Sequence, residues 1–343
     1  MDMVRKPTRK QNLKRKRKGS VVPHAYTYVG SDHMPSTKRA AYLGAGVFGT
    51  TYRMRSKLDQ RLCAVKQTTS CCRAEAEHLA LTPPHPNVTA YFGCRRGKRG
   101  MWIVLELVGS GATVVPRRDH PHRIQVLVSV ARALAHLHTH NLVHRDVKCT
   151  NVFLSSALPG GRVVLGDLGL AAPTNDDGMY AHTDAAPQGR GHRVYRAPEV
   201  TDGRPYGRAA DMYALGGMLF ELVLGQSADA VVGNSTSAGW HRGLAGWLRT
   251  LEGRETLEDV RVDCRAPDGV PVASLRLLAE NPEDRPCSAD VVRHFTYPIP
   301  TRCLTARETP RVLAEPHLPR GPRLPQEPRR PPSVPAGMPA MPT

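Results

Sequence analysis

Apolar residues recur at helical spacing between residues 124 and 140, and short apolar runs lie on either side of this stretch. Intervals of three and four place such residues on one face of a helix; they are Ile124, Leu127, Val128, Ala131, Leu134, Ala135 and Leu137. Upstream, residues 102–109 have the length and composition of a buried strand. Downstream, residues 152–154 and 163–165 predict the two strands of a β-hairpin joined by residues 155–162. The pattern therefore predicts a buried strand, a long helix and a hairpin, in that order.

The two ends of the chain carry much of its positive charge. The 343 residues suffice for one large domain with tails, and the formal net charge is +18. Near the N-terminus, the basic block from Lys14 to Lys18 is accompanied by a single acid, Asp2. We expect residues 1–38 to form a disordered basic arm. Such an arm is either a solvated tail or a binding site for importin, nucleic acid or an acidic membrane surface, and importin binding would direct the protein to the nucleus.

The C-terminal residues 298–343 form a proline-rich tail with a regular period. Proline recurs every third residue, at Pro316, Pro319, Pro322, Pro325, Pro328 and Pro331. A polyproline II helix has three residues per turn, so these rings share one face. The segment that begins at Pro325 and ends at Arg330 fits a PxxPxR ligand of an SH3 domain. The tail is therefore either a stiff spacer or an SH3-binding element.

Composition bears on the compartment of the protein. No run of about 18 apolar residues occurs, so we expect no membrane span. The N-terminus is basic without an apolar core, which does not fit a secretory signal. The eight cysteines show no paired CxxC pattern. We therefore expect an intracellular protein with reduced thiols.

A glycine-rich segment near residue 45 has the composition of a phosphate-binding loop. Its positions Leu43, Gly44, Gly46, Phe48 and Gly49 are followed by Ala64-Val65-Lys66. Glycines let backbone N–H groups approach phosphate oxygens closely, because no side chain intervenes. Lys66 lies twenty residues after Gly46, an interval that suits a strand, a turn and the next strand. The segment therefore predicts a nucleotide-phosphate site that includes a lysine.

Three further motifs follow in order at workable spacings. The first runs from Val143 to Asn151 and carries Asp146, Lys148 and Asn151. The others are Gly166-Asp167-Leu168-Gly169 and Arg196-Ala197-Pro198-Glu199. Asp211-Met212-Tyr213-Ala214-Leu215-Gly216 and Asn281-Pro282-Glu283-Asp284-Arg285 come later. Any one of these strings can arise by chance, but the ordered set does not.

As a set, these motifs resemble a eukaryotic-type serine/threonine protein kinase over about residues 40–297. The resemblance implies an α+β, bilobal protein-kinase fold within residues 39–297. A small β-rich N-lobe with one main helix would occupy residues 39–108, and a larger, mostly helical C-lobe residues 109–297. It also implies that Asp211 braces the catalytic loop and that Arg285 pairs with Glu199 inside the large lobe.

The resemblance assigns roles to individual residues. Asp146 would be the catalytic base, Lys148 the cation beside the transferred phosphoryl group, and Lys66 the partner of the α and β phosphates of ATP. Asn151 and Asp167 would hold Mg²⁺. The nucleotide site would comprise Leu43, Gly44, Gly46, Phe48, Gly49, Thr51, Ala64, Lys66, Glu75, Leu105, Glu106, Val108 and Phe153. Leu105 would be the gatekeeper at the entrance to the hinge.

Lys66 needs a glutamate partner on the next helix, and two residues qualify. Glu75 precedes Leu79 by four residues, which places both on one helical face. Glu77 is the alternative. The interval from Lys66 is short, so the helix must begin almost at once.

The stretch from Asp167 to Glu199 corresponds to the activation segment of the family. His192 stands where most serine/threonine kinases have Thr, and its side chain is expected to donate to Asp146, which would make activity depend on pH near neutrality. In the family, the residue matching Arg145 usually meets a phosphate on this segment. Thr174, Tyr180 and Thr183 are available, but none lies at the usual offset, so we predict no activation by phosphorylation.

A few short segments bear on the origin of the protein and on its substrate. The short interval after Lys66, the loop that contains Asp146 and the run Leu165-Gly166-Asp167 are similar to herpesviral serine/threonine kinases, which implies action in the host nucleus. Of the acids that select basic peptides, Glu221 alone remains, so we expect no strong selectivity for such peptides. Two alternatives stay open: a pseudokinase or scaffold, and an adaptor that acts through its tails.

Overall fold

A computed structural model describes the part of the chain that holds these motifs. The described residues are 25–30, 36–46, 49–68, 73–97, 100–109, 113–114, 122–156, 160–180, 191–234, 243–250, 253–257 and 276–296. All of them lie within one compact unit, residues 1–299. The basic block from Lys14 to Lys18, Phe48 and the proline-rich tail lie outside the described residues.

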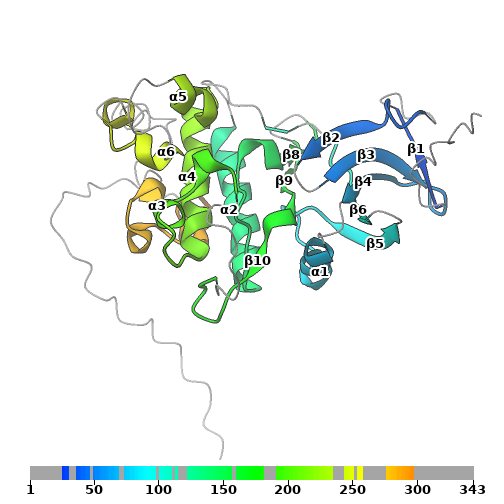
Figure 1. Ribbon diagram of the computed structural model, residues 1–343, viewed down its shortest axis with the longest axis horizontal. Coiled ribbons are helices and arrows are strands. Elements are labelled where there is room, and N and C mark those ends of the chain that lie inside the picture. The colour runs from blue at the N-terminus through cyan, green and yellow to red at the C-terminus, as the bar shows by residue number, and fades with distance from the viewer. Residues whose placement is uncertain are drawn as a thin grey trace, which may run out of the picture. The chain divides into compact units, whose positions relative to one another are not determined.

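The strands between Tyr26 and Glu106 form an antiparallel sheet (Figure 1). Its strands follow the order β1-β3-β4-β6-β5, with β2 paired to the other end of β3. They are β1 (Tyr26–Tyr28), β2 (Tyr42–Gly46), β3 (Gly49–Ser56), β4 (Leu62–Thr68), β5 (Tyr91–Gly97) and β6 (Gly100–Glu106). In the register of the sheet, Lys66 of β4 stands beside Thr51 of β3 and Ile103 of β6. The glycine-rich hairpin and the lysine therefore share one corner of the sheet.

Part of the expected basic arm, residues 1–38, belongs to the sheet. Tyr26–Tyr28 forms a strand paired with residues 54–56, and Val29 is only 1% exposed. The ring of Tyr28 packs edge-on against Tyr52, with centroids 5.5 Å apart. Two tyrosines on an otherwise unpaired sheet edge bury apolar area that charged residues cannot, which ends the arm before this strand. The boundary at residue 38 is therefore wrong.

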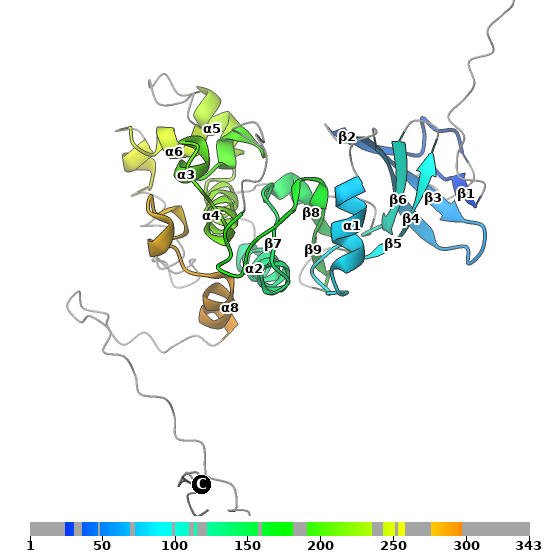
Figure 2. The ribbon, with the colours of Figure 1, turned by 60° about the horizontal axis from the view of Figure 1, so that its bottom comes forward.

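The helix α1 (Arg73–Leu81) lies beside β5, as Figure 2 shows. Its buried residues Ala76 and Leu79 join the main core. The helix begins seven positions after Lys66, so the short connection predicted from the sequence is present. The small lobe is thus one sheet with one helix, as expected.

The other described residues of the unit are mostly helical and contain two small two-stranded sheets. The helices are α2 (Arg123–Thr139), α3 (Pro198–Thr201), α4 (Arg208–Leu224), α5 (Ala228–Asn234), α6 (Gly243–Trp247) and α8 (Ser288–Thr296). The hairpin predicted after α2 is formed by β8 (Val152–Leu154) and β9 (Val163–Leu165). The strand β7 (Leu142–Val143) pairs with β10 (Ala172–Pro173). The fold is the bilobal α+β arrangement that the motifs implied.

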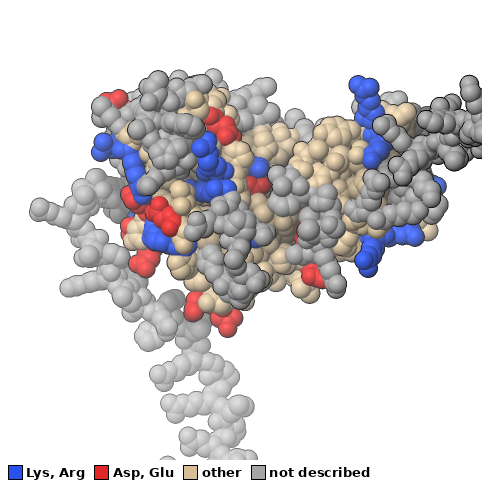
Figure 3. Space-filling view, in the orientation of Figure 1, with Lys and Arg blue, Asp and Glu red and all other residues tan. Residues whose placement is uncertain are grey.

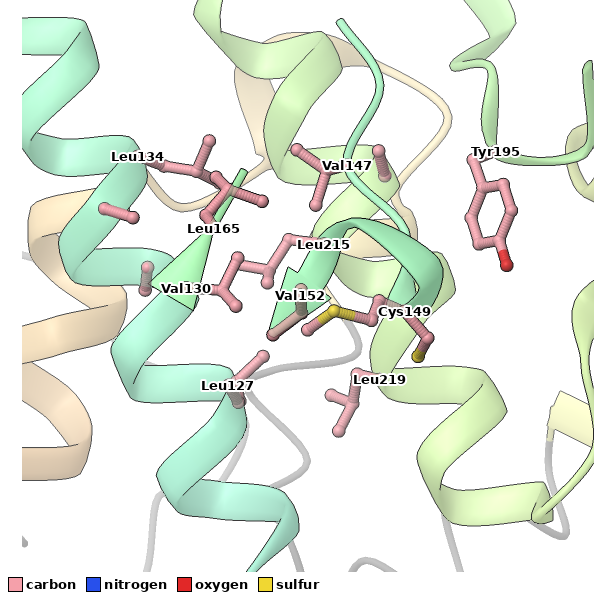
Figure 4. Packing of buried hydrophobic residues seen from close by; sticks show 14 of the residues in the cluster. Leu127, Val130, Leu134, Val147, Cys149, Val152, Leu165, Tyr195, Leu215 and Leu219 are labelled. Carbon is pink, nitrogen blue, oxygen red and sulfur yellow. The ribbon is translucent and has the colours of Figure 1, made fainter. Parts of the chain in front are cut away.

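The core of the large lobe fixes the loop between β7 and β8. Figure 4 shows Val147 and Cys149 of this loop among Leu127, Leu215 and Leu219, which come from α2 and α4. Val147 is 1% and Cys149 2% exposed. Because these two positions point into the core, the side chains of the alternate residues Asp146 and Lys148 are turned away from it, and they contact each other.

The surface is unevenly charged. In Figure 3 basic and acidic side chains are intermingled over the helical lobe, whereas the middle of this face is largely uncharged. Within the described ranges, no helix has both the length and the apolar character needed to cross a bilayer. The described cysteines Cys63, Cys94, Cys149 and Cys287 are free thiols.

Candidate active site

A cleft lies between the sheet and the large lobe. It is lined by every residue expected to contact the nucleotide except Phe48, which is outside the described residues; these are Leu43, Gly44, Gly46, Gly49, Thr51, Ala64, Lys66, Glu75, Leu105, Glu106, Val108 and Phe153. Lys148, Asn151 and Asp167 line the same cleft from the other lobe. Motifs about 100 residues apart in the sequence therefore meet around one hollow.

Five other lining residues were not expected from the sequence, namely Ala45, Thr89, Leu107, Thr113 and Thr150. Ala45, Leu107 and Thr150 each lie next to a predicted position, so inclusion of neighbours would have found them. Thr89 and Thr113 carry no such signal. Thr89 reaches the cleft because its hydroxyl donates to the carbonyl of Leu165 at 3.2 Å, and Thr113 because it bridges to Phe153.

The hinge after β6 is held against the β8–β9 hairpin. Gly109 has a φ of +53°, and a Cβ built there would lie 2.5 Å from the carbonyl oxygen of Leu154. Both the left-handed backbone and this close approach require glycine. The side chain of Glu106 forms an ion pair with Arg162 of the hairpin. The hinge therefore has a defined path along the cleft.

Lys66 is the centre of a buried charge cluster. Its Nζ lies 2.8 Å from Oε1 and 3.0 Å from Oε2 of Glu75, and 2.7 Å from Oδ1 of Asp167. The partner chosen in the structure is Glu75, which is buried, whereas Glu77 is exposed. One cation thus joins strand β4, helix α1 and the loop after β9.

The electrostatics of this cluster act differently on its three members. Burial raises the pKa of Glu75, and the charge and hydrogen bond of Lys66 only partly offset this. Burial by itself lowers the pKa of Lys66, but the charges of Asp167 and Glu75 outweigh it, so the pKa lies above its ordinary value. For Asp167, burial raises the pKa, and the charge and hydrogen bond of Lys66 reverse the effect, so the pKa is lowered. The cleft therefore holds a fixed positive charge flanked by carboxylates.

Asp146 is held by three donors. Its Oδ2 accepts from Nδ2 of Asn151 at 2.9 Å and lies 2.8 Å from Nζ of Lys148. Its Oδ1 accepts from the backbone N–H of His192 at 3.2 Å. Asp146 as a whole residue is 8% exposed. The donors therefore fix the direction of its carboxylate, and a small part of the residue remains accessible to solvent. This arrangement suits a base that takes a proton from a positioned hydroxyl.

Asn151 and Asp167 fit the requirements of a magnesium ion. The amide nitrogen of Asn151 is used on the backbone carbonyl and the carboxylate of Asp146, which leaves its amide oxygen as a ligand. Asp167 contributes a carboxylate to the same cleft. Mg²⁺ is usually bound through one or two carboxylates, phosphate oxygens and water, so an incomplete protein shell is what this ion uses.

The loop that carries Asp146 is braced from below by Asp211 of α4. Oδ1 of Asp211 accepts from the N–H of Arg145 and Oδ2 from the N–H of His144, both at 2.8 Å. Nε2 of His138 donates to Oδ2 at 2.9 Å. Asp211 is 1% exposed. The expected bracing contact is confirmed, and His138 is an additional partner that the motif did not reveal.

The ring of His192 does not reach Asp146. Only the backbone N–H of His192 donates to that carboxylate, whereas Nε2 of the ring lies 3.4 Å from Oδ2 of Asp229 in α5. The predicted side-chain contact is therefore wrong. The chain direction before the 3₁₀ turn Arg193–Tyr195 points the amide, rather than the side chain, at the catalytic loop.

Glu221 is not available to a peptide substrate. It is 1% exposed, and its Oε1 accepts from the hydroxyl of Tyr195 at 2.5 Å and from the N–H of Ala228 at 2.6 Å. Burial raises its pKa. Glu221, the acid expected from the sequence to select basic peptides, instead forms buried hydrogen bonds that connect α4 to the end of the activation segment and to α5.

The expected buried pair of Glu199 and Arg285 is confirmed. Arg285 donates from both terminal nitrogens, at 2.6 Å and 2.8 Å, to the two carboxylate oxygens of Glu199. The guanidinium also lies over the ring of Tyr213, 5.0 Å from its centroid. The pair fastens the end of the activation segment to the base of the large lobe.

The sequence is similar to those of known protein kinases. Residues 37–295 match the model of the protein kinase domain family. The chain is 31% identical over 193 residues to mouse (Mus musculus) serine/threonine-protein kinase Nek5 and 31% identical over 194 residues to Schizosaccharomyces pombe serine/threonine-protein kinase sid1. It is 30% identical over 203 residues to Mycobacterium bovis serine/threonine-protein kinase PknJ.

These alignments cover 52%, 53% and 54% of this chain and 29%, 40% and 33% of the respective relatives. The chain therefore spans less than half the length of the relatives that it matches. Because the family model covers most of the chain, the chain belongs to the protein kinase domain family.

Proposed function

We propose that this chain is a serine/threonine protein kinase that transfers the γ-phosphoryl group of MgATP to protein hydroxyls. The observation that carries the proposal is the convergence of two clusters on one cleft. Lys66, fixed by Glu75 and Asp167, stands on one side, and Lys148 and Asn151, which both contact the Asp146 carboxylate, line the other. An isolated ion pair or an isolated acid has many structural uses, but this combination serves phosphoryl transfer.

Asp146 has the central chemical role in this proposal. Its carboxylate accepts the proton of the attacking hydroxyl, and Lys148, 2.8 Å away, offsets the charge around the reacting group. Lys66 binds phosphate oxygens, and Glu75 keeps its side chain extended into the cleft. Asn151 and Asp167 would hold Mg²⁺, which would supply charge neutralisation when bound with ATP, the source of the transferred group. Most of the rate enhancement then comes from positioning and preorganised charge.

Two features favour serine and threonine as acceptors. Lys148 is the form of the catalytic loop that resembles serine/threonine rather than tyrosine kinases. The relatives reported above are all named serine/threonine-protein kinases. Because Glu221 is buried, its carboxylate does not favour basic peptide substrates.

The test is transfer from labelled MgATP to casein and a histone by the purified full chain, with Asp146→Asn alongside. Loss of the base should lower turnover roughly 10²- to 10⁴-fold while calorimetric MgATP binding persists. Asp59→Asn, which removes an exposed carboxylate on a distant turn, is the matched control and should behave as wild type. Equal transfer by wild type and Asp146→Asn would contradict the assignment. MgATP binding without any transfer would favour the scaffold alternative.

Finer proposals concern origin, compartment and tails. The herpesviral resemblance rests on sequence motifs, while the relatives named above come from a mammal, a yeast and a mycobacterium. We propose nuclear import through the block from Lys14 to Lys18, and SH3 binding through the segment from Pro325 to Arg330. Deletion of residues 1–24 and of residues 298–343 separates these functions from catalysis, which should survive both deletions.

A further inference from the structure

The side chain of Arg145 is engaged on several sides. Its Nε donates to the carbonyl of Leu170 at 2.6 Å, and one terminal nitrogen donates to the hydroxyl of Tyr206 at 3.2 Å. The guanidinium carbon lies 4.7 Å from the ring centroid of Tyr180. The rings of Tyr180 and Tyr206 are themselves in contact, with centroids 5.4 Å apart. Two tyrosines therefore enclose the cation that immediately precedes Asp146.

The tyrosines are brought together by backbone pairing. The N–H of Tyr180 donates to the carbonyl of Tyr206 at 2.8 Å, and Met179 bridges to Gly207. The N–H of Arg208 donates to the carbonyl of Gly178 at 3.2 Å. The first part of the activation segment is therefore docked on the turn before α4, and its position depends on hydrogen bonds rather than on Arg145 alone.

The backbone of Arg145 is constrained as tightly as its side chain. Its φ of +65° is left-handed, which a non-glycine residue adopts only when its surroundings hold it there. Its N–H donates to Asp211, and a Cβ built on Gly191 would lie 2.4 Å from its carbonyl oxygen. A shift of the Arg145 side chain is thus transmitted to Asp146, the next residue.

Neutral groups make the side-chain contacts of Arg145. Among the residues that the structure describes, no carboxylate lies within ion-pair distance of its guanidinium, and a carbonyl, a hydroxyl and an aromatic face take its place. Burial, together with the charge of Arg145, lowers the pKa of nearby His78, which favours a neutral imidazole there. A neutral histidine and an aromatic clamp suit a site arranged without phosphate.

We propose that Tyr180 and Tyr206 are positioning residues for phosphoryl transfer, which hold Arg145, and with it the loop of Asp146, in place without a phosphate on the activation segment. This inference rests on the proposed kinase function. The ring of Tyr180 supplies the face on which the cation lies, and the hydroxyl of Tyr206 supplies the oxygen that orients it. The two tyrosines thus connect the first part of the segment and the turn before α4 to the catalytic loop.

A double-mutant cycle on the full chain tests the proposal. Wild type, Tyr206→Phe, Arg145→Ala and the double variant are treated with phosphatase, checked by intact mass, and assayed with MgATP and casein. We expect wild type to remain active when dephosphorylated. Loss of one hydrogen bond to a cation should lower kcat of Tyr206→Phe roughly tenfold, with KM for ATP unchanged. In the Arg145→Ala background, Tyr206→Phe should have no further effect.

Conservative variants separate the clamp from general stability. Tyr180→Phe keeps the aromatic face and should retain more activity than Tyr180→Leu, whose kcat should fall about fivefold through the lost cation–π contact. Tyr26→Phe removes a tyrosine hydroxyl from β1, outside the cleft, and is the control. Thermal unfolding of each variant checks that the fold is retained.

Two outcomes of the kinetic experiments would contradict the proposed role of the tyrosines. Activity that appears only after phosphorylation of the segment, or a Tyr206→Phe loss that is equally large in the Arg145→Ala background, would overturn the proposal. If wild type binds MgATP but transfers nothing in either phosphorylation state, the kinase function itself fails. Amide hydrogen exchange then still reports the clamp. Protection of the Tyr180 amide should fall in both Tyr206→Phe and Arg145→Ala, and unchanged protection would show that no clamp exists.

Discussion

Nζ of Lys66 lies 2.8 Å from Oε1 of Glu75, although only nine residues separate the two along the chain. The contact is made because α1 begins at Arg73 and places Glu75 in its first turn, facing β4. A short connection between strand and helix therefore does not prevent the ion pair. It requires only that the glutamate stand near the start of the helix rather than at its middle.

Removal of the charge on Glu75 should impair transfer. In Glu75→Gln, Lys66 keeps Asp167 as its single carboxylate partner and loses the contact that extends it into the cleft. We expect kcat/KM for ATP to fall roughly 10- to 100-fold, as for a lost hydrogen bond to a buried charged group. The measurement is the initial rate of transfer against MgATP concentration. Glu77→Gln is the matched control, because Glu77 lies on the exposed side of the same helix, and an equal loss there would contradict the assignment.

Removal of Arg285 should unfold the large lobe. Arg285→Ala leaves the buried carboxylate of Glu199 without its bidentate partner, and breaking one side of such a pair costs roughly 3–5 kcal/mol. Urea denaturation followed by circular dichroism measures this cost. Arg249→Ala breaks an exposed ion pair with Glu280 and should cost less than about 1 kcal/mol. Similar losses in both variants would mean that burial of the Glu199 pair is not what matters.

The stability contributed by Asp211 should depend on pH. Burial by itself raises the pKa of Asp211, but the hydrogen bond and charge of His138 and the N–H of His144 reverse the effect, so the folded-state pKa lies below its ordinary value. The ionised carboxylate of Asp211 therefore stabilises the fold fully at pH values above its pKa in the unfolded chain. This contribution is lost as the pH falls through the folded-state pKa.

Asp211→Asn tests this linkage. The variant should be less stable than wild type by about 3 kcal/mol at neutral pH, as for a broken buried network. The difference should begin to shrink as the pH falls below about 4, where the carboxylate of the unfolded chain becomes protonated, and should continue to shrink down to the lower folded-state pKa. Urea midpoints across this range give the comparison. A difference that does not change with pH would assign the effect of Asp211 to shape rather than charge.

Replacement of His192 should leave the pH dependence of catalysis unchanged. The backbone N–H at this position contacts Asp146, and the imidazole contacts Asp229 instead. His192→Thr keeps the amide, so turnover should persist and its pH–rate profile near neutrality should overlay that of wild type. Loss of a titration step in the variant would show that the ring acts on the catalytic loop after all.

Some features of this site could be predicted from short stretches of sequence because their geometry is local. Asp146, Lys148 and Asn151 lie within one tight loop, so their spacing alone brings them together. The period of the apolar residues predicted α2, which the structure places at Arg123–Thr139. The hairpin of β8 and β9 was equally visible, since two apolar runs with a polar connection between them have few other solutions.

Other features could not be predicted because they depend on distant partners. Tyr26–Tyr28 became a strand only because the edge of β3 was open to it. Glu221 and His192 have ordinary sequence surroundings, and only the packing of α5 against the activation segment directs the first inward and the second toward Asp229. The enclosure of Arg145 by Tyr180 and Tyr206 likewise joins segments that are 61 residues apart.

The sequence by itself determined the family, the lobes and the chemical groups of the cleft, because backbone periodicity and closely spaced polar motifs report local geometry. The tertiary structure decided which glutamate pairs with Lys66, which atom of residue 192 meets Asp146, and what holds Arg145. These choices depend on the direction of a side chain relative to elements that follow much later in the chain. The competing alternatives differ only in which contacts form when the lobes pack.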